Sequence, residues 1–407
     1  MNEKTKSIYV DPNRVTRFFF VIILTGLAHG LYQGVQDNFL AEIVQISKFE
    51  RGIVEFFREL PGLLLIFILA TMYRFSETKV FKIGIAIMLT GMLGLLLLGT
   101  GKIVVVLCLV IYSLGEHIIM PITSTISMHL AKSGKSGASL GITSAMKYGG
   151  RIIGFLLVTG LFLIFPRLKI SPSSVKSYKI IFFLATILLV GATFVVLAMR
   201  DKGTVVKRSR LYFDRKFNKY YGLEIFYGAR KQIFFTFAPY VLILHYGAST
   251  SIISLLLAIC ATFGMLLSPL IGRLIDRLGY KFIMVTDTLI LMVVCFFYGF
   301  SHRLFSFEVA FIVVCVNFVL DSIISLGSLA SSVYVQDIAS NPEEITATIT
   351  TGISVNHLIS VIIALLGGYI WQQTGIEVLF TLSGLLGLAN TIFAATIKKP
   401  KKALSTS

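Results

Sequence analysis

Charged and polar side chains occur inside stretches that are otherwise apolar, at spacings that place them on common helical faces. In residues 16–40, His29, Gln33 and Asp37 recur every four positions, with Tyr32 alongside. An ionisable group in the middle of a membrane-spanning helix costs about 3 kcal/mol, so such groups face a polar cavity or pair with one another. The pattern indicates a route for a polar solute through an apolar protein.

Basic residues within the apolar stretches are candidates for binding an anionic group of a substrate. These are Arg58, Lys147, Arg151, Arg230 and Lys231. Arginine can hold a carboxylate or a phosphate through two hydrogen bonds. Neutral side chains in the same region are further candidate substrate contacts: Gln33, Asn356, Tyr32 and Tyr227. The alternative interpretation is that these bases form fixed ion pairs with the buried carboxylates, which nearly equal them in number.

Other ionisable residues in these stretches are candidates for proton coupling, namely Glu116, Asp37, Glu55, Glu59, Asp321, His117 and His357. An apolar environment favours the protonated form of an acid and a nearby arginine favours the ionised form. A carboxylate that alternates between the two environments could therefore carry a proton. Glu116 is the first choice for this role. A histidine titrates near neutral pH, but a single histidine in a helix is more often simply hydrogen-bonded.

The composition requires a membrane around these residues. Hydrophobic residues make up 56% of the chain and charged residues only 14%, which is too little polar material to cover a soluble globule. A helix needs about 20 apolar residues to cross a bilayer. The sequence predicts an all-α polytopic membrane protein with twelve spans, at residues 16–40, 52–73, 79–99, 103–131, 137–165, 178–199, 219–246, 250–271, 282–300, 306–336, 346–370 and 376–397.

The basic residues are distributed as in a membrane protein, although a net charge of +17 could suggest a nucleic-acid partner. In the twelve-span topology most of the 37 Lys and Arg residues lie on one side, and the short loop containing Lys48 and Arg51 lies on the other. Positive charge accumulates on the cytoplasmic side, so both termini are expected in the cytoplasm of a cell-membrane protein. No nucleic acid is expected to bind.

The chain reads as two related halves. Residues 200–218 form the only long polar break and separate six predicted spans from six, so the predicted domains are 1–199 and 219–407 with a basic cytoplasmic linker between them. Ser113-Leu114-Gly115 recurs as Ser325-Leu326-Gly327, and Gly141-Ile142-Thr143 recurs as Gly352-Ile353-Ser354. Repeated halves around a central binding site are a common plan of transporters.

A charged turn lies between two apolar runs at residues 272–281. It resembles the signature of the major facilitator superfamily, G-x-L-x-D-R-x-G-R-K, through Gly272, Asp276, Arg277, Gly279 and Lys281, together with Leu274; Tyr280 replaces the first basic residue. The resemblance implies two pseudo-symmetric six-helix bundles that rock about a central cavity. The matching loop of the first half, residues 73–79, lacks the glycines and the aspartate, so the second-half loop is the better candidate for a cytoplasmic gate.

A second, partial resemblance lies in the fifth predicted span. Residues 141–150, with Gly141, Gly149 and Gly150, are similar to the antiporter motif of the same family, although Ala145 and Met146 replace its Gly-Pro pair. The alternative interpretation is that these small residues only permit close helix packing. The motif would favour efflux, whereas a basic cavity fits uptake of an anion equally well.

These features predict a secondary transporter rather than an enzyme. Its substrate is a small organic anion or zwitterion, and its coupling ion is a proton, or alternatively sodium. The four cysteines are expected to be reduced packing residues. No cofactor, metal site or phosphate-binding loop is predicted. Membrane lipids are the expected surroundings of a monomer. The alternatives are a proton-driven multidrug efflux antiporter or a lipid or lysolipid flippase of the same fold, and, from other classes, a channel or a transport-derived receptor.

Overall fold

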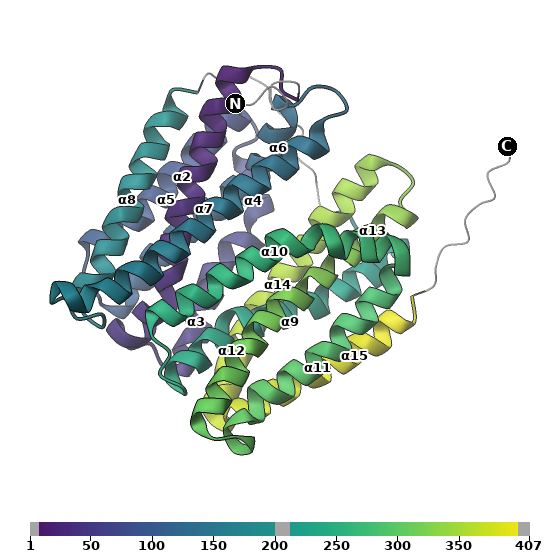
Figure 1. Ribbon diagram of the computed structural model, residues 1–407. Helices are drawn as coiled ribbons and strands as arrows, with labels where there is room; N and C mark the ends of the chain where they lie inside the picture. Colours follow the sequence, from purple (N-terminus) through teal and green to yellow (C-terminus); the bar gives the residue numbers. More distant parts are fainter. Residues whose placement is uncertain (1–7, 200–211, 398–407) are drawn as a thin grey trace. The chain divides into compact units, whose positions relative to one another are not determined.

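The computed structural model describes residues 8–199 and 212–397, and most of these residues lie in helices (Figure 1). Within these two ranges no β-strand forms, and the backbone pairing outside the helices includes one isolated bridge between Tyr9 and Ala131. The prediction of an all-α protein is confirmed for the described residues.

The helices before the central linker follow the predicted spans closely. They are α2 (Pro12–Asn38), the π-helical turn η1 (Phe39–Ile43), α3 (Lys48–Leu63), α4 (Leu65–Thr71), α5 (Glu77–Leu97), α6 (Lys102–Leu130), α7 (Ser136–Ile164), the 3₁₀ turn η2 (Phe165–Leu168) and α8 (Val175–Leu197).

The helices after the linker begin with a short 3₁₀ turn. They are η3 (Arg215–Phe217), α9 (Asn218–Leu244), α10 (Thr250–Leu278), α11 (Tyr280–Leu304), α12 (Phe307–Ile324), the 3₁₀ turn η4 (Ser325–Ser328), α13 (Leu329–Ile338), α14 (Pro342–Thr374) and α15 (Ile376–Ala395).

Ten helical segments of the described chain are long and apolar enough to cross a membrane. They are Arg14–Ile43, Glu77–Leu97, Lys102–Leu130, Ser136–Leu168, Val175–Leu197, Thr250–Leu278, Tyr280–Leu304, Phe307–Ile338, Glu343–Thr374 and Ile376–Ala395. The other two predicted spans, 52–73 and 219–246, are formed by the α3–α4 pair and by α9, which carry many of the polar candidates. The chain is a multi-pass membrane protein, and the number twelve stays a prediction.

Two predicted spans are interrupted in the structure. Pro61 lies in the last turn of α3, and the chain leaves α-helical geometry at Leu64 before α4 resumes. Proline has no backbone N–H and its ring crowds the preceding turn, so a break at this point is expected. The predicted span 306–336 is likewise divided by η4, which separates α12 from α13. Broken helices free backbone carbonyls within the spans, where they can bind ligands.

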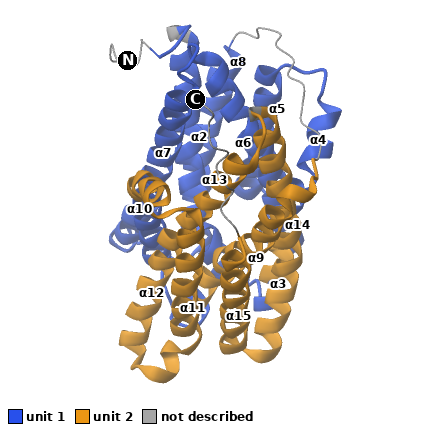
Figure 2. Ribbon diagram, turned by 90° about the vertical axis from the view of Figure 1, so that its right-hand side faces the viewer, with its two compact units in different colours: residues 1–50, 57–208, 242–265 blue, residues 51–56, 209–241, 266–407 orange. Residues whose placement is uncertain are grey.

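The chain divides into two compact units, coloured in Figure 2. Unit 1 consists of residues 1–50, 57–208 and 242–265, and unit 2 of residues 51–56, 209–241 and 266–407. Most of each predicted half falls within one unit, while residues 51–56 group with unit 2 and residues 242–265 with unit 1. The predicted domain boundaries at 199 and 219, and the basic linker, are therefore retained as a prediction; most of the linker lies outside the described residues.

Within unit 1, α2 and α7 pack with their backbones in close contact. A Cβ at Gly26 would lie 2.6 Å from the carbonyl oxygen of Lys147, and a Cβ at Gly154 would lie 2.6 Å from the carbonyl oxygen of Leu27. Small residues allow membrane helices to approach in this way. The consequence for the site is that residues of α7 are held directly against the polar face of α2.

Candidate functional site

A chain of polar contacts crosses unit 1 from α6 through α2 to α7. Glu116 Oε1 of α6 lies 3.1 Å from Nδ1 of His29 on α2. The other ring nitrogen of His29, Nε2, lies 3.1 Å from Oε1 of Gln33, one turn along the same helix. Arg151 of α7 donates a hydrogen bond from Nη2 to the same amide oxygen. The structure thus brings together three predicted site residues, Glu116, Gln33 and Arg151, with His29 at the centre.

The contacts of His29 require one proton more than a neutral imidazole beside an ionised carboxylate would have. Because Arg151 donates to Oε1 of Gln33, that oxygen is an acceptor, and His29 Nε2 must donate to it. Nδ1 of the same ring faces the carboxylate of Glu116. Either the imidazole is protonated on both nitrogens or Glu116 carries the proton and donates it. The His29–Glu116 pair can therefore hold and release one proton.

Two buried tyrosines enclose this pair. The rings of Tyr32 on α2 and Tyr112 on α6 have centroids 4.3 Å apart, and both side chains are almost fully buried. The Tyr112 hydroxyl lies 3.5 Å from Nδ1 of His29. Tyr32 is one of the predicted substrate contacts, and Tyr112 shares a helix with Glu116.

The bases of α7 differ from the other candidate bases in their partners. Among the described residues, Arg151 bonds to the neutral amide of Gln33 and lies 5.9 Å from the Tyr148 ring, and its Nε has no hydrogen-bond acceptor. Lys147, one turn earlier and half-buried, forms no ion pair with a described carboxylate. Both retain donors for an anion, which is the chemistry expected of a substrate-binding base.

Arg58, Glu59 and His117 each contact another group of unit 1. Arg58 Nη2 lies 2.9 Å from Glu59 Oε1, and both side chains are buried. The hydroxyl of Ser113 donates to the Arg58 carbonyl over 2.6 Å, and Nδ1 of His117 lies 2.8 Å from the Ser113 carbonyl. Asp37, two turns beyond His29 on α2, is half-buried.

Arg51, which was assigned to a loop before the second predicted span, lies in a helix. Ser47 and Glu50 form a capping box, which starts α3 at Lys48 and brings Arg51 into its first turn. Arg51 is 1% exposed, lies 2.8 Å from Glu55 one turn later, and its guanidinium is 5.5 Å from the Tyr240 ring. Glu55 therefore has a buried partner, Arg51, which was missed because the predicted span begins at residue 52.

In unit 2, Arg230 of α9 is held between two carboxylates. Its Nη2 lies 3.1 Å from Asp321 Oδ1 of α12, and its Nη1 lies 3.6 Å from Asp287 Oδ2 of α11. Nη2 also donates to the Asp321 carbonyl over 3.3 Å. Two carboxyl groups therefore flank one guanidinium: Nη2 is hydrogen-bonded to Asp321, whereas Nη1 and the carboxyl oxygens of Asp287 form no hydrogen bond with a described residue.

Asp287 is a cluster member that the sequence analysis left out because it lies near one end of its predicted span. The side chain is 5% exposed. A Cβ at Gly327 in η4 would lie 2.6 Å from Asp287 Oδ2, so the absence of a side chain at Gly327 leaves room for this carboxylate beside Arg230. An aspartate within an apolar run indicates a polar contact. The sequence spacing of residues 230, 287 and 327 does not predict that they meet.

The remaining candidates of unit 2 lie along α9 and α14. Tyr227 is buried, and Lys231 is exposed. Asn356 of α14 donates from Nδ2 to Oε2 of Glu224 over 3.2 Å, and the next residue, His357, is buried. Glu224 is another group that the sequence analysis did not assign to a site.

The loop at residues 272–281 forms the sharp turn between α10 and α11. Gly279 has a φ of +87°, which residues with a side chain rarely adopt, so a glycine is required at this turn. A Cβ at Gly272 would meet nothing within 4 Å. Asp276 and Arg277 are exposed and Lys281 is half-buried. Tyr280 is buried, with its ring 5.5 Å from that of Tyr334, which explains an aromatic residue at a usually basic position.

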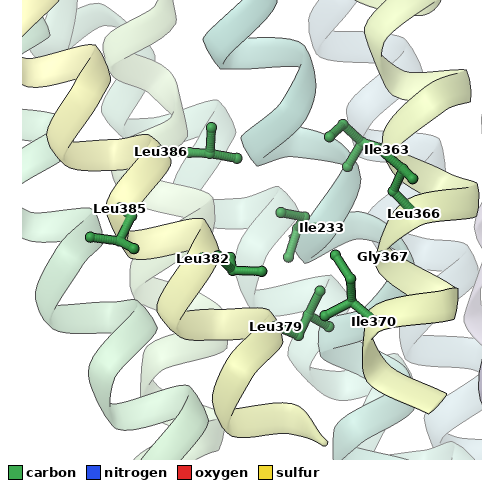
Figure 3. A pocket seen from close by; sticks show the side chains of 9 residues that line it. All are labelled: Ile233, Ile363, Leu366, Gly367, Ile370, Leu379, Leu382, Leu385 and Leu386. Carbon is green, nitrogen blue, oxygen red and sulfur yellow. The ribbon is translucent and has the colours of Figure 1, made fainter. Parts of the chain in front are cut away.

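Unit 2 also contains an apolar cavity of about 340 Å³, shown in Figure 3. Every lining residue is aliphatic or glycine, from α9, α14 and α15: Ile233, Ile363, Leu366, Gly367, Ile370, Leu379, Leu382, Leu385 and Leu386. Such a lining suits a hydrocarbon chain and offers no side-chain donor to a polar solute.

Comparisons with known proteins agree with this arrangement. The family described as Major Facilitator Superfamily matches residues 221–407. The chain is similar in structure to the nucleoside transporter NupG, with 14% identity, a TM-score of 0.74 and coverage of 94% of this chain and 99% of that one. It is similar to a D-xylose-proton symporter, with 14% identity, a TM-score of 0.75 and coverage of 95% and 98%.

A third similar structure is a POT family transporter in complex with 5-aminolevulinic acid, with 11% identity, a TM-score of 0.73 and coverage of 94% of this chain and 96% of that one. No curated protein sequence matches the chain.

The apolar helices define a multi-pass membrane protein, and its fold is that of solved membrane transporters. The Major Facilitator Superfamily model matches the second half of the chain, residues 221–407, and the fold is shared with solved transporters over nearly the whole chain. The turn at residues 272–281 pointed to this family.

Proposed function

We propose that the protein moves a small organic anion or zwitterion across the cytoplasmic membrane by alternating access, coupled to a proton. The observation that carries the proposal is that the α7 bases pair with no carboxylate: among the described residues, Arg151 bonds a neutral amide and Lys147 forms no ion pair. The buried arginines Arg51, Arg58 and Arg230 already contact carboxylates. An anionic substrate group supplies the missing partner for Arg151.

Coupling to a proton is assigned to the His29–Glu116 pair beside Arg151. The pair holds one dissociable proton in its present geometry. Binding of an anion at Arg151 adds negative charge near the imidazole and favours the protonated pair, so substrate and proton bind together. Gln33 transmits this effect because it contacts both His29 and Arg151. A similar protein is named a D-xylose-proton symporter, which supports proton coupling in this fold.

The proposal includes the topology predicted from the sequence. Twelve spans in two pseudo-symmetric six-helix bundles, with both termini in the cytoplasm, would place the loop at Gly272 to Lys281 on the cytoplasmic side as a gate. The domains remain 1–199 and 219–407. Proline and glycine positions that break α3 and the α12–α13 span support bending within the bundles.

The test uses the purified protein in proteoliposomes, with labelled organic anions and zwitterions that include 5-aminolevulinic acid. An inward proton gradient should drive accumulation by the wild type. Arg151→Gln should raise KM on the order of tenfold to a hundredfold, because a hydrogen bond to a charged group contributes about 1.5–3 kcal/mol. Arg167→Gln, which removes an exposed arginine of η2, is the matched control and should transport normally.

Proton coupling has its own variant. Glu116→Gln should abolish gradient-driven accumulation and retain counterflow exchange, because substrate binding persists without a transferable proton. Normal accumulation by Glu116→Gln would remove this residue from the coupling mechanism. Unchanged KM in Arg151→Gln would instead remove the anion site from α7.

A second candidate function is transport of a lipid, favoured by the apolar cavity between α9, α14 and α15 (Figure 3). A flippase needs an apolar path for the acyl chain next to polar groups for the headgroup, and Ile233 of this cavity lies one turn from Arg230 on α9. A fluorescent-lipid scrambling assay separates the two functions: a lipid transporter moves the labelled lipid between leaflets, and a solute carrier does not.

A further inference from the structure

A groove of about 530 Å³ lies between the end of α5 and the start of α8, within unit 1. Its walls are apolar and its two polar side chains are both lysines: Leu96, Val175, Lys176, Lys179, Ile180 and Phe183. The volume falls within the range of about 300–1,000 Å³ that is typical of ligand sites. An apolar groove with two cations at one end has the chemistry to hold an amphiphile with an anionic head.

The two helices pack side by side in opposite directions, so the groove lies at one end of the pair (Figure 1). Lys82, in the second turn of α5, donates from Nζ to the carbonyl oxygen of Leu197, the last residue of α8, over 3.2 Å. The last turn of α5 therefore lies beside the first turns of α8. Ser174 caps α8 by accepting a hydrogen bond from the backbone N–H of Ser177, which fixes where the helix begins.

The two lysines have no anionic partner in the described part of the chain. Neither Lys176, which is exposed, nor Lys179, which is half-buried, forms an ion pair or a hydrogen bond with a described residue. Lys102, at the start of α6, is by contrast paired with Glu50 over 2.7 Å. The sequence from 117 to 200 contains no aspartate or glutamate, so α7, α8 and the loop between them supply no carboxylate to the groove.

The start of a helix adds to this uncompensated charge. The backbone N–H groups at a helix N-terminus carry partial positive charge and favour an anion. α8 has no acidic residue in its first turn, whereas Glu77 occupies that place in α5. Glu42 contacts α8 through the hydroxyl of Tyr178, and its other carboxylate oxygen accepts a hydrogen bond from Asn38. The positive potential at this end of the groove therefore favours an anionic ligand.

Beyond the lysines, one face of α8 continues as an apolar path. Phe183 and Ile187 follow Lys176 and Ile180 at helical spacing, and each of the two is 51% exposed. At 1.5 Å per residue, Ile187 lies about 16 Å along the helix from Lys176. Half of the hydrocarbon core of a bilayer is about 15 Å thick, so this path has the length of an acyl chain in one leaflet. In the predicted topology the start of α8 is on the outer side, where basic residues are otherwise scarce.

We propose that this groove binds one anionic phospholipid, with its headgroup phosphate at Lys176 and Lys179 and one acyl chain along Ile180 and Phe183. The headgroup balances the charge of the two lysines and of the helix start, and the acyl chain covers the apolar walls. A lipid in this position contacts both α5 and α8. The site does not depend on the transported substrate or on the coupling ion.

The test uses the full-length protein in lipid bilayers, with Phe183→Trp as a fluorescent reporter in the wall of the groove. Brominated lipids quench tryptophan on contact, so brominated phosphatidylglycerol and brominated phosphatidylcholine, each at a low mole fraction, report which lipid occupies the groove. The unsubstituted protein supplies the signal of the native Trp371 for subtraction.

Phosphatidylglycerol, the anionic lipid, should bind more tightly than zwitterionic phosphatidylcholine at this reporter. Each basic residue near an anionic lipid contributes about a fivefold factor in affinity, so Lys176→Gln combined with Lys179→Gln should weaken the binding of phosphatidylglycerol about 25-fold. Excess inorganic phosphate at constant ionic strength should leave the quenching unchanged, because a free anion does not fill the apolar groove.

Two matched controls separate this site from general attraction of anionic lipid to a basic protein. Lys132→Gln combined with Lys135→Gln removes the same charge from exposed positions between α6 and α7 and should keep the lipid preference. Phe307→Trp, a reporter at the start of α12 whose native side chain is 62% exposed, should show a much smaller preference.

Four results would overturn the proposal. They are equal quenching by the two lipids at Phe183→Trp, an unchanged preference after the Lys176 and Lys179 substitutions, an equal loss of preference in the Lys132 and Lys135 control, and relief of quenching by inorganic phosphate. Because no transport is measured, failure of the proposed transport function leaves this result intact.

Discussion

Replacing either carboxylate around Arg230 should destabilise the protein by about 1–2 kcal/mol, whereas replacing both should destabilise it by at least the sum of the two single changes. Asp321 and Asp287 lie 3.1 Å and 3.6 Å from different nitrogens of the same guanidinium. With one of them changed to asparagine, the arginine keeps one buried carboxylate and the pair becomes neutral. With both changed, a buried cation has no charged partner.

The magnitudes follow from the geometry. At an effective dielectric constant of 20, each contact contributes about 5 kcal/mol of attraction, and the difference between the two distances is worth less than about 1 kcal/mol. Repulsion between the two carboxylates offsets part of this gain. Asp287→Asn should therefore destabilise the protein by about 1 kcal/mol, the value of an ordinary hydrogen bond, and Asp321→Asn by about 2, because Asp321 accepts the more direct bonds from Arg230.

The double variant should lose about 3–5 kcal/mol, the usual cost of leaving one member of a buried ion pair alone. Arg230→Gln, which leaves two carboxylates without a cation, should lose at least as much. A double-mutant cycle of Asp287→Asn and Asp321→Asn measures the interaction between the two sites as a coupling free energy. A single Asp287→Asn variant as unstable as the double variant would refute the view that the two carboxylates share one charge.

The assay is thermal unfolding in detergent at one scan rate, because irreversible unfolding makes the transition temperature depend on that rate. The test compares the order of the transition temperatures of the four variants, so absolute free energies of unfolding are not required. Glu308→Gln, which changes an exposed carboxylate of α12, should match the wild type.

Three further perturbations test how the helices are positioned. Gly154→Ala should destabilise unit 1 by about 1–3 kcal/mol because its Cβ would lie 2.6 Å from the Leu27 carbonyl. Gly160→Ala on the same helix, where a Cβ meets nothing within 4 Å, should be neutral; equal thermal shifts would contradict the packing of α2 on α7. Gly279→Ala should cost about 1–3 kcal/mol because of its φ of +87°, whereas Gly272→Ala, in open space, should not; transition temperatures compare the two directly. Partial burial alone would raise the pKa of Glu50, but hydrogen bonds from Lys102 and Ser47 lower it below its ordinary value. A lowered pKa stabilises the fold above the unfolded-state pKa, and this contribution is lost as pH falls through the folded pKa, so Glu50→Gln should cost about half a kcal/mol at neutral pH and nothing in acid; a pH-independent difference would contradict it.

The helical architecture was predictable because it depends on local patterns. Apolar runs of membrane length mark helices whatever their neighbours are, and Gly279 is required by the backbone of its own turn. The start of α3 was missed because the apolar run begins after Ser47, whereas the capping box that starts the helix uses polar residues. A capping signature at Ser47 and Glu50 was present in the sequence and would have brought Arg51 into the helix.

Pairing between helices was not predictable in the same way. The helical period places Arg230 on a face of α9, but it does not say that Asp287 of α11 and Asp321 of α12 meet there. The five predicted bases were therefore treated as equivalent. Their partners, which depend on tertiary packing, make them different.

The partners also decide which base can bind a substrate. A buried arginine that already contacts carboxylates gains less from an added anion, because its positive charge is already balanced. Arg230 with two carboxylates and Arg58 with Glu59 are in that position. Arg151, which bonds a neutral amide, gains a full charge-assisted contact when an anion arrives. Variants of Arg151 should therefore change substrate affinity with little effect on stability, and variants of Arg230 should do the reverse.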